Sequence, residues 1–280
     1  MNALSTYSKM IKLSHSIFAL PFALAAAILA ARDVEVTALQ IALIIGCMVT
    51  VRSSAMGFNR VIDRDIDAAN PRTANREIPA GEISVAAAWG FTLGSAGLFV
   101  LFAALLSNTV LLLSPVALAI VWGYSYTKRF TALCHLFLGL GLALAPTGVW
   151  IALTDSYSAV PALMSLAVGT WVAGFDIIYS CQDAEYDQGV GLRSIPAVLG
   201  LRNALIVSAL LHVVTIGSLV ALPAVVALGP MYWVGVVVIG GVLAYEHWIV
   251  RPTDLSRIDK AFFDLNGYVS LAFLLFVFLA

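Results

Sequence analysis

The stretch TALQIALIIGCMVTVRSSAMGFNRVIDRDID occupies residues 37–67. Its first part, residues 37–62, is mostly apolar, and a helix that crosses a lipid bilayer needs about 20 such residues. Its last part carries Asn59, Asp63 and Asp67, three polar residues spaced by four. The stretch therefore predicts a transmembrane helix that ends in a polar cluster at one surface of the membrane.

Nine apolar runs of this length occur along the 280 residues. They lack the alternation of polar and apolar residues that barrel strands show, which excludes a transmembrane barrel. The runs cover residues 15–31, 37–62, 85–106, 109–126, 131–153, 159–182, 203–222, 229–250 and 261–279. The first run follows two lysines, as a secretory signal does, but the eight later runs favour a retained helix. We predict an all-α integral membrane protein whose nine transmembrane helices form a single domain, residues 1–280.

The composition agrees with a membrane protein. Hydrophobic residues make up 61% of the chain and charged residues 11%, with a mean hydropathy of +0.96. Soluble domains are about 45–50% apolar and about 25% charged. These values exclude a soluble enzyme and a disordered protein, and a net charge of −1 gives no basic field for nucleic acid. The three cysteines stand singly in apolar runs, without the spacing of a disulfide framework or a metal site.

The basic residues predict the orientation in the membrane. If the N-terminus is cytoplasmic and the spans alternate, 13 of the 15 Lys and Arg residues fall on the cytoplasmic side. Only Arg32 falls on the opposite side, and Arg52 lies inside the second span. Because cytoplasmic loops carry an excess of Lys and Arg, we expect a cytoplasmic N-terminus and a C-terminus on the other side. The long loops after the second, sixth and eighth spans then face the cytoplasm.

Two acidic clusters end the second and the sixth spans. Asn59, Asp63 and Asp67 share one helical face, and Arg52 lies two turns deeper on nearly the same face. The second cluster contains Asp176, Tyr179, Asp183, Glu185 and Asp187. Carboxylates that are stacked in this way repel one another unless cations lie between them.

Magnesium is the cation that suits such carboxylates, because it is held by one or two of them and shares its remaining coordination with water and phosphate. We predict that Asp63, Asp67, Asp183 and Asp187 bind Mg²⁺ and, through it, a diphosphate. Asp65 and Glu185 lie off the shared faces and are interpreted as solvated. Four cationic side chains in the adjoining loops are candidate partners of the phosphate oxygens: Arg72, Arg76, Lys128 and Arg193.

The two clusters also resemble copies of one another. The first is followed by Arg-Glu-Ile-Pro-Ala at residues 76–80, and the second by Arg-Ser-Ile-Pro-Ala at residues 193–197. Asp63 and Asp183 are 120 residues apart, an interval that contains four helices. Related halves that present polar helix ends to a shared cavity are a recurring membrane architecture.

A cation inside the bundle could bind a carboxylate on a second substrate. Arg52 is the deep candidate, and Lys12 and His15 at the start of the first span are others. Arg52 is equally suited to be the structural partner of Asp176. The remaining histidines are interpreted as helix-end or packing residues, because they lack metal-ligand companions: His135, His212 and His247.

With these motifs the chain resembles the UbiA-type intramembrane prenyltransferases over most of its length. The family pattern NxxxDxxxD matches Asn59, Asp63 and Asp67, and a second DxxxD matches Asp183 and Asp187. Between them lie two further elements, RTxxR at Arg72, Thr73 and Arg76, and YxxxK at Tyr124 and Lys128. The resemblance implies a nine-helix bundle around a central cavity, capped on the cytoplasmic side by the two loops that follow the acidic helices.

Within that family, the stretches at residues 12–21, 55–60 and 171–179 are most similar to the quinone-biosynthesis branch. Glu77 departs from the proline that many members have there. The resemblance implies an enzyme of the bacterial cytoplasmic membrane that transfers a polyprenyl group from polyprenyl diphosphate to an aromatic carboxylate. The acceptor would be 4-hydroxybenzoate or 1,4-dihydroxy-6-naphthoate. It also places Tyr124, Asp176 and Tyr179 in the catalytic or acceptor pocket, and no obligatory protein partner is evident.

Other functions remain open at this point. A secondary transporter also contains repeated halves and buried charge, although its charges lie midway through the membrane rather than at one face. A phosphatidyl-alcohol transferase would carry a single, tightly spaced aspartate signature, which is absent from this sequence. Prenylation of haem or chlorophyll precursors fits the branch-like stretches less well.

Overall fold

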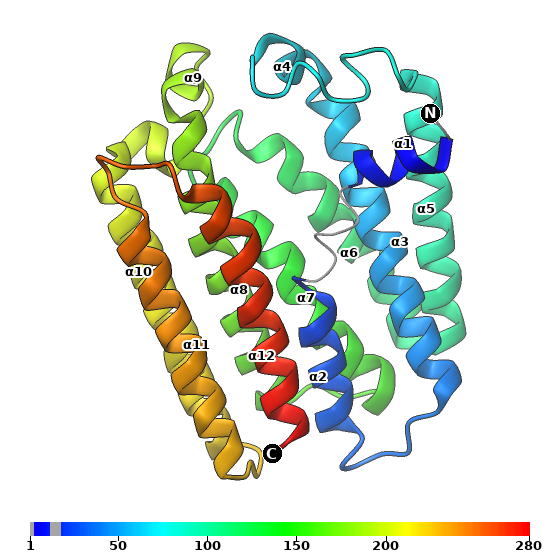
Figure 1. Cartoon of the computed structure of the whole chain (residues 1–280). Coiled ribbons are helices and arrows are strands. Elements are labelled where there is room, and N and C mark those ends of the chain that lie inside the picture. Colours follow the sequence, from blue (N-terminus) through cyan, green and yellow to red (C-terminus); the bar gives the residue numbers. More distant parts are fainter. Residues whose placement is uncertain (1–2, 12–17) are drawn as a thin grey trace. The chain divides into compact units, whose positions relative to one another are not determined.

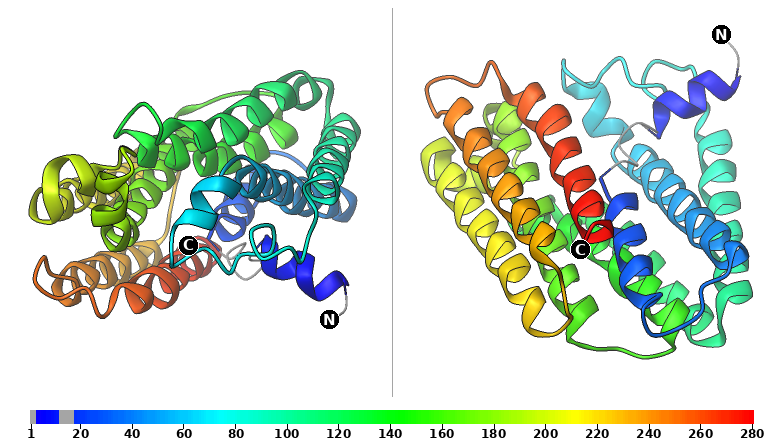
Figure 2. Two further views of the ribbon diagram at one scale, coloured as in Figure 1. Left: turned by 90° about the horizontal axis from the view of Figure 1, so that it is seen from above. Right: turned by 60° about the horizontal axis from the view of Figure 1, so that its bottom comes forward.

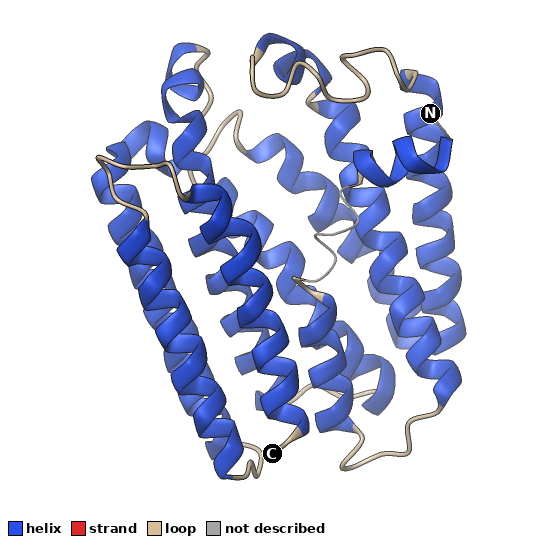
Figure 3. Cartoon of the chain, viewed as in Figure 1, coloured by secondary structure: helices blue, strands red, loops and turns tan. Residues whose placement is uncertain are grey.

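The computed structural model describes residues 3–11 and 18–280, and its regular structure is helical throughout these ranges (Figure 3). The only β-type pairing in the described chain is an isolated bridge between Arg251 and Asp254. Eight helices are long and apolar enough to cross a membrane. The chain is therefore an all-α integral membrane protein, as predicted.

Contacts divide the described residues into two units, which are considered separately. Unit 1 comprises residues 3–11 and 38–126, and unit 2 comprises residues 18–37 and 127–280. The prediction that residues 1–280 form a single domain stays a prediction.

Unit 1 is built on α3 (Ala38–Ile62) and α5 (Val85–Leu106), which pack along their lengths. At their crossing a Cβ atom added to Gly57 would lie 2.4 Å from Thr92 Oγ1, so only glycine permits this approach. The short α1 (Ala3–Met10) is held to α3 by Arg60, whose Nε donates to the carbonyl oxygen of Met10 at 3.3 Å. The unit is completed by α4 (Arg64–Ala69) and by α6 (Asn108–Thr127), whose last residue is assigned to unit 2.

Unit 2 contains the other long helices, and their bounds are as follows: α2 (Leu20–Ala30), α7 (Cys134–Thr154), α8 (Ala159–Ser180), α9 (Ala184–Gly189), α10 (Ile195–Ala221), α11 (Pro230–Ile249) and α12 (Asn266–Phe278), with the short turns η2 (Cys181–Asp183), η3 (Leu222–Ala224) and the π-helical η4 (Lys260–Leu265). α8 packs against both α7 and α10. α7 and α8 cross at Gly139 and Gly169, where a Cβ on Gly139 would meet the Gly169 carbonyl oxygen at 2.2 Å. α11 and α12 lie side by side in every view (Figures 1 and 2).

The predicted spans agree with the helices except in two places. The first predicted span, 15–31, corresponds to α2, which has only 11 residues, and residues 12–17 lie outside the described chain. The seventh, 203–222, covers the part of α10 that follows Gly200, and the helical turn at residues 195–199 belongs to no predicted span. Gly200 breaks the helix between these two parts with φ 75° and ψ 161°, a conformation that favours glycine.

Candidate active site

The first acidic motif forms the junction between α3 and α4. Asp63 precedes α4 with φ −93° and ψ 3°, and its N–H still donates to the Asn59 carbonyl oxygen at 2.9 Å. The side chains stack as their spacing predicts, because Asn59 Nδ2 donates to Asp63 Oδ2 at 2.9 Å. Asp63 is only 2% exposed. Asn59 therefore orients one oxygen of a buried carboxyl group.

Asp67 follows one turn later and is held by the loop after α4. Both of its carboxylate oxygens accept from Arg76 Nη1 at 2.7 Å, and its carbonyl oxygen accepts from Thr73 Oγ1 at 3.0 Å. The start of the loop is ordered by Asn70, whose Oδ1 accepts from the N–H of Arg72 at 2.9 Å. The RTxxR stretch thus folds back over α4, and Arg76 neutralises the buried Asp67.

The second acidic motif forms the corresponding junction between α8 and α9. Asp183 precedes α9 with φ −99° and ψ 0°, close to the values at Asp63. Asp187 lies within α9, and its Oδ2 accepts from Ser194 Oγ at 2.8 Å. Two six-residue helices, each preceded by one aspartate and carrying the second aspartate of its motif four residues later, support the interpretation of the motifs as copies.

Each motif supplies two carboxylates, which is the number that a magnesium ion commonly takes from protein. Within the described ranges, no three His, Cys, Asp or Glu side chains come together as a preformed metal cluster. The donor chemistry of each pair fits Mg²⁺ that completes its coordination with water and phosphate oxygens. The shared site of all four aspartates stays a prediction.

The basic residues near the second acidic motif, Lys128 and Arg193, make different kinds of contact. Lys128 and His135 interact electrostatically with Asp187. Arg193 is exposed, its Nη1 donates to the Phe130 carbonyl oxygen at 3.1 Å, and its N–H donates to the Lys128 carbonyl oxygen at 2.7 Å. This backbone hydrogen bond joins the segment that follows α6 to the loop that follows α9. The phosphate-binding roles of Lys128 and Arg193 stay predictions.

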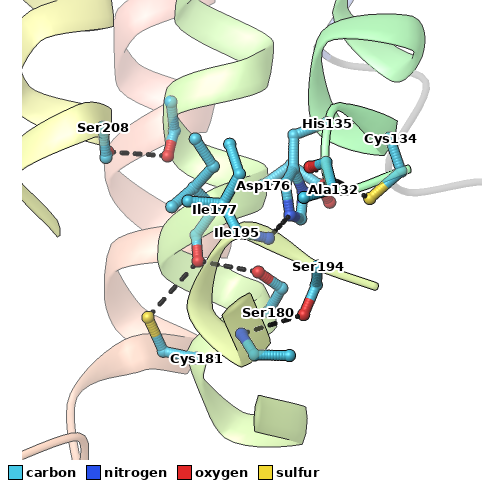
Figure 4. Close-up of polar contacts among 12 residues, drawn as sticks. Ala132, Cys134, His135, Asp176, Ile177, Ser180, Cys181, Ser194, Ile195 and Ser208 are labelled. Carbon is cyan, nitrogen blue, oxygen red and sulfur yellow. Dashed lines mark hydrogen bonds and ion pairs between the residues drawn. The ribbon is translucent and has the colours of Figure 1, made fainter. Parts of the chain in front are cut away.

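A histidine that the sequence analysis assigned to packing takes part in a polar contact of unit 2. His135 Nδ1 lies 2.7 Å from Asp176 Oδ2, and the N–H of Ile195 donates to His135 Nε2 at 3.3 Å (Figure 4). Since Nε2 must offer a lone pair to this N–H, the proton on the ring belongs on Nδ1, where it faces the carboxylate. The buried imidazole therefore joins α7, α8 and the start of α10. His135 and Asp176 are 41 positions apart in the sequence, so no local sequence pattern predicts that they pair.

Arg52 lies in α3, two turns before Asn59. Its Nε atom is buried and has no hydrogen-bond partner in the structure. Its guanidinium interacts electrostatically with Tyr124 of α6. A buried donor without a partner is costly and rare, so this atom is available to an anionic ligand.

Five further residues were singled out in the sequence, and the structure describes three of them: Tyr179, Asp65 and Glu185. Tyr179 packs on Phe262 of η4, with ring centroids 4.1 Å apart. Lys12 and His15 lie outside the described residues. Asp65 is exposed, and its Oδ1 lies 3.5 Å from Arg64 Nε. This exposure agrees with its interpretation as a solvated residue. Glu185 is likewise exposed.

Comparisons with known proteins extend over nearly the whole chain. Residues 19–276 match the model of the UbiA prenyltransferase family. A 4-hydroxybenzoate octaprenyltransferase of Vibrio cholerae is 30% identical over 224 residues, 79% of this chain and 78% of that protein. The Vibrio atlanticus enzyme of the same name is 28% identical over 225 residues, 80% of this chain and 78% of that protein.

Solved structures agree with the family match. The apo structure of a UbiA homologue from Aeropyrum pernix K1 is similar with a TM-score of 0.86 and 34% identity, covering 95% of this chain and 97% of that one. A UbiA homologue from Archaeoglobus fulgidus bound to DMAPP and Mg²⁺ shares the fold, with a TM-score of 0.78, 19% identity and 98% coverage of both chains. By its sequence, its helices and its two aspartate motifs, this chain belongs to the UbiA prenyltransferase family.

Proposed function

We propose that this protein transfers a polyprenyl group from polyprenyl diphosphate to a ring carbon of 4-hydroxybenzoate, with release of diphosphate, in quinone biosynthesis. The observation that carries the proposal is the pair of matching helix junctions, each of which presents two aspartates. The names of the curated relatives favour 4-hydroxybenzoate over 1,4-dihydroxy-6-naphthoate as the acceptor. Family membership supports a prenyltransferase in either case.

In this proposal each aspartate pair would hold Mg²⁺: Asp63 and Asp67 in unit 1, and Asp183 and Asp187 in unit 2. The ion supplies positive charge that stabilises the diphosphate as a leaving group. A homologue with the same fold was solved with DMAPP and Mg²⁺, which supports a divalent ion in this family. Asn59 contributes by fixing the orientation of the Asp63 carboxyl group through their 2.9 Å hydrogen bond.

The cationic side chains stabilise the charge that develops on the leaving diphosphate. We assign this role to Arg72, Arg76, Lys128 and Arg193. The bond between the first prenyl carbon and its oxygen breaks, and the electron pair stays on the diphosphate. The ring carbon of the acceptor then forms the new carbon–carbon bond, and the ring proton leaves to the released diphosphate or to a site carboxylate.

The acceptor needs a cation for its carboxylate, and Arg52 has the unpaired buried donor to provide one. Tyr124 lies within electrostatic range of the same guanidinium. Arg52 and Tyr124 of unit 1 therefore bind the acceptor in this proposal. The roles of Asp176 and Tyr179, which belong to unit 2, stay predictions. The prenyl tail stays in hydrocarbon, because each CH₂ group exposed to water costs about 0.8 kcal/mol.

We also propose an orientation of the protein in the membrane. With a cytoplasmic N-terminus, the loops after α4 and α9 face the compartment in which diphosphate is released. The strong bias of Lys and Arg toward that side supports this arrangement.

The test uses purified protein in lipid nanodiscs with geranyl diphosphate, Mg²⁺ and either 4-hydroxybenzoate or 1,4-dihydroxy-6-naphthoate. Mass spectrometry should detect the C-prenylated 4-hydroxybenzoate. The Asp63→Ala and Asp183→Ala variants should make no product. The matched control, Asp65→Ala, replaces an exposed aspartate and should remain active. Absence of product from the wild-type protein with both acceptors would refute the proposal. Solute uptake that requires sealed, energised vesicles would instead indicate a transporter.

A further inference from the structure

α6 is a weakly buried helix of unit 1. α6 is the least buried of the eight long apolar helices in the described chain. It contains Pro115, and a proline inside a helix removes a backbone hydrogen bond and permits a bend. The proline therefore loosens the link between the two halves of α6, and contacts with α3 contribute to the position of the second half.

Trp122 makes the most specific of these contacts. Its indole Nε1 donates to Ser54 Oγ of α3 at 3.0 Å. Its ring stacks in parallel on Phe58, one turn after Ser54, with centroids 4.9 Å apart. A second hydrogen bond between the helices, from Asn59 Nδ2 to Ser125 Oγ, is longer at 3.4 Å. The Trp122 hydrogen bond and ring stack together set the register of α6 against α3.

The acceptor of this hydrogen bond is itself fixed. Ser54 is fully buried, and its hydroxyl donates to the carbonyl oxygen of Thr92 on α5 at 3.0 Å. α3 and α5 are in close contact beside it, at Gly57 and Thr92. The hydroxyl of Ser54 therefore keeps one direction, with its proton toward α5 and a lone pair toward Trp122.

The register matters because the two proposed acceptor-binding residues flank this contact. Arg52 precedes Ser54 by two residues on α3, and Tyr124 follows Trp122 by two residues on α6. The guanidinium and the phenol interact electrostatically, and Arg52 Nε is a buried donor without a partner. A shift of α6 along α3 would change the spacing between these two groups.

We propose that Trp122 is a positioning residue for the aromatic acceptor: its hydrogen bond to Ser54 sets the spacing between Arg52 and Tyr124. The inference rests on the proposed function, since it assigns a role within the same acceptor site. Trp122 itself does not contact the reacting atoms in this proposal. It determines selectivity for an acceptor whose carboxylate and ring must fit that spacing.

The experiment compares Trp122→Phe, Ser54→Ala and the double variant in the nanodisc assay. Trp122→Phe keeps an aromatic ring on Phe58 and removes the N–H donor. Loss of one hydrogen bond should raise the KM for 4-hydroxybenzoate about two- to tenfold, while the KM for geranyl diphosphate stays unchanged. The double variant should be no worse than Ser54→Ala alone, because that substitution already removes the bond from Trp122 as well as the one to Thr92. Trp89→Phe is the matched control, since Trp89 contacts Phe58 from α5, with its ring edge-on and its centroid 5.7 Å away.

The outcomes separate this inference from the proposed function. An active Trp122→Phe variant with a wild-type acceptor KM would overturn the inference and leave the proposed function intact. Equal rises in both KM values, or a rise in Trp89→Phe as well, would indicate general loss of packing and would also overturn it. If Trp122→Phe does not fold, Ser54→Ala removes the same bond from α3 and is judged by the same acceptor KM. A wild-type protein without product would refute the proposed function first.

Discussion

Asn266 joins three helices of unit 2 and permits a quantitative prediction. Its Oδ1 accepts from Trp171 Nε1 of α8 at 2.7 Å. Its Nδ2 donates to Glu246 Oε1 of α11 at 3.1 Å and to the Ala261 carbonyl oxygen at 3.0 Å. Asn266, Trp171 and Glu246 are all fully buried. The other oxygen of Glu246, Oε2, already lacks a hydrogen-bond partner.

We expect Asn266→Ala to destabilise the protein by about 2 kcal/mol. The substitution deprives the Trp171 N–H and the Glu246 carboxyl group of their Asn266 partner, and a buried polar group without one costs about 1–3 kcal/mol. Hydrogen bonds inside membrane proteins average about 0.6 kcal/mol and reach about 1.7 kcal/mol, so the lower end of the range applies to each group. A change of 2 kcal/mol lowers the ratio of folded to unfolded protein roughly 30-fold.

The measurement is reversible unfolding of the purified protein by titration with sodium dodecyl sulfate. Asn203→Ala is the control, because Asn203 is exposed and its side chain donates only to the carbonyl oxygen of Leu199, four residues earlier. It should change the free energy by less than about 0.5 kcal/mol. In a Trp171→Phe background, Asn266→Ala should cost about 1 kcal/mol less, since no indole N–H remains to lose its partner. A cost below about 0.5 kcal/mol for Asn266→Ala alone, or strict additivity with Trp171→Phe, would refute the reasoning.

Three further results are expected. Arg76→Ala should lower kcat about tenfold to a hundredfold, because Asp67 stays buried without its cation, and Arg76→Lys should retain more activity; equal kcat in all three proteins would contradict this. His135→Phe should destabilise the protein by about 1–3 kcal/mol in the same unfolding titration, because Asp176 and the N–H of Ile195 both lose their partner. Excess EDTA should stop product formation and added Mg²⁺ should restore it, and product formed in the chelator would exclude a metal.

Most of the fold could be predicted because apolar length is a direct physical requirement of the bilayer. The helical turn at residues 195–199, before Gly200, has no counterpart among the predicted spans. Arg202 and Asn203 follow this turn, which is too short to form an apolar run of membrane-spanning length. Ser194 caps the helix, and its Oγ accepts from the N–H of Ala197 at 3.3 Å, with Pro196 in the first turn. A serine followed by a proline in this position is a recognisable helix start that hydropathy does not detect.

The candidate site divides into local contacts that spacing predicts and distant contacts that it does not. Asn59 and Asp63 are four residues apart on one helix, so their contact follows from helical geometry. The pairing of His135 with Asp176 depends on how α7 packs against α8, which neither segment encodes by itself. The contact between Trp171 and Asn266 spans 95 residues and has the same origin. Such pairs require the tertiary structure.

The repeated sequence after each aspartate motif shows how one pattern gives two local structures. Arg-Glu-Ile-Pro-Ala at residues 76–80 forms turns, whereas Arg-Ser-Ile-Pro-Ala at residues 193–197 enters α10. The differing residue explains this, because Ser194 can accept a hydrogen bond at a helix N-terminus and the longer Glu77 side chain is poorly suited to do so. Ser194 also donates to Asp187, while in the first copy Arg76 turns back to Asp67. The two copies therefore keep the aspartates at the junctions and differ in the side chain bonded to the second aspartate, a guanidinium at Asp67 and a hydroxyl at Asp187. This difference predicts unequal roles for Asp67 and Asp187 in binding the diphosphate.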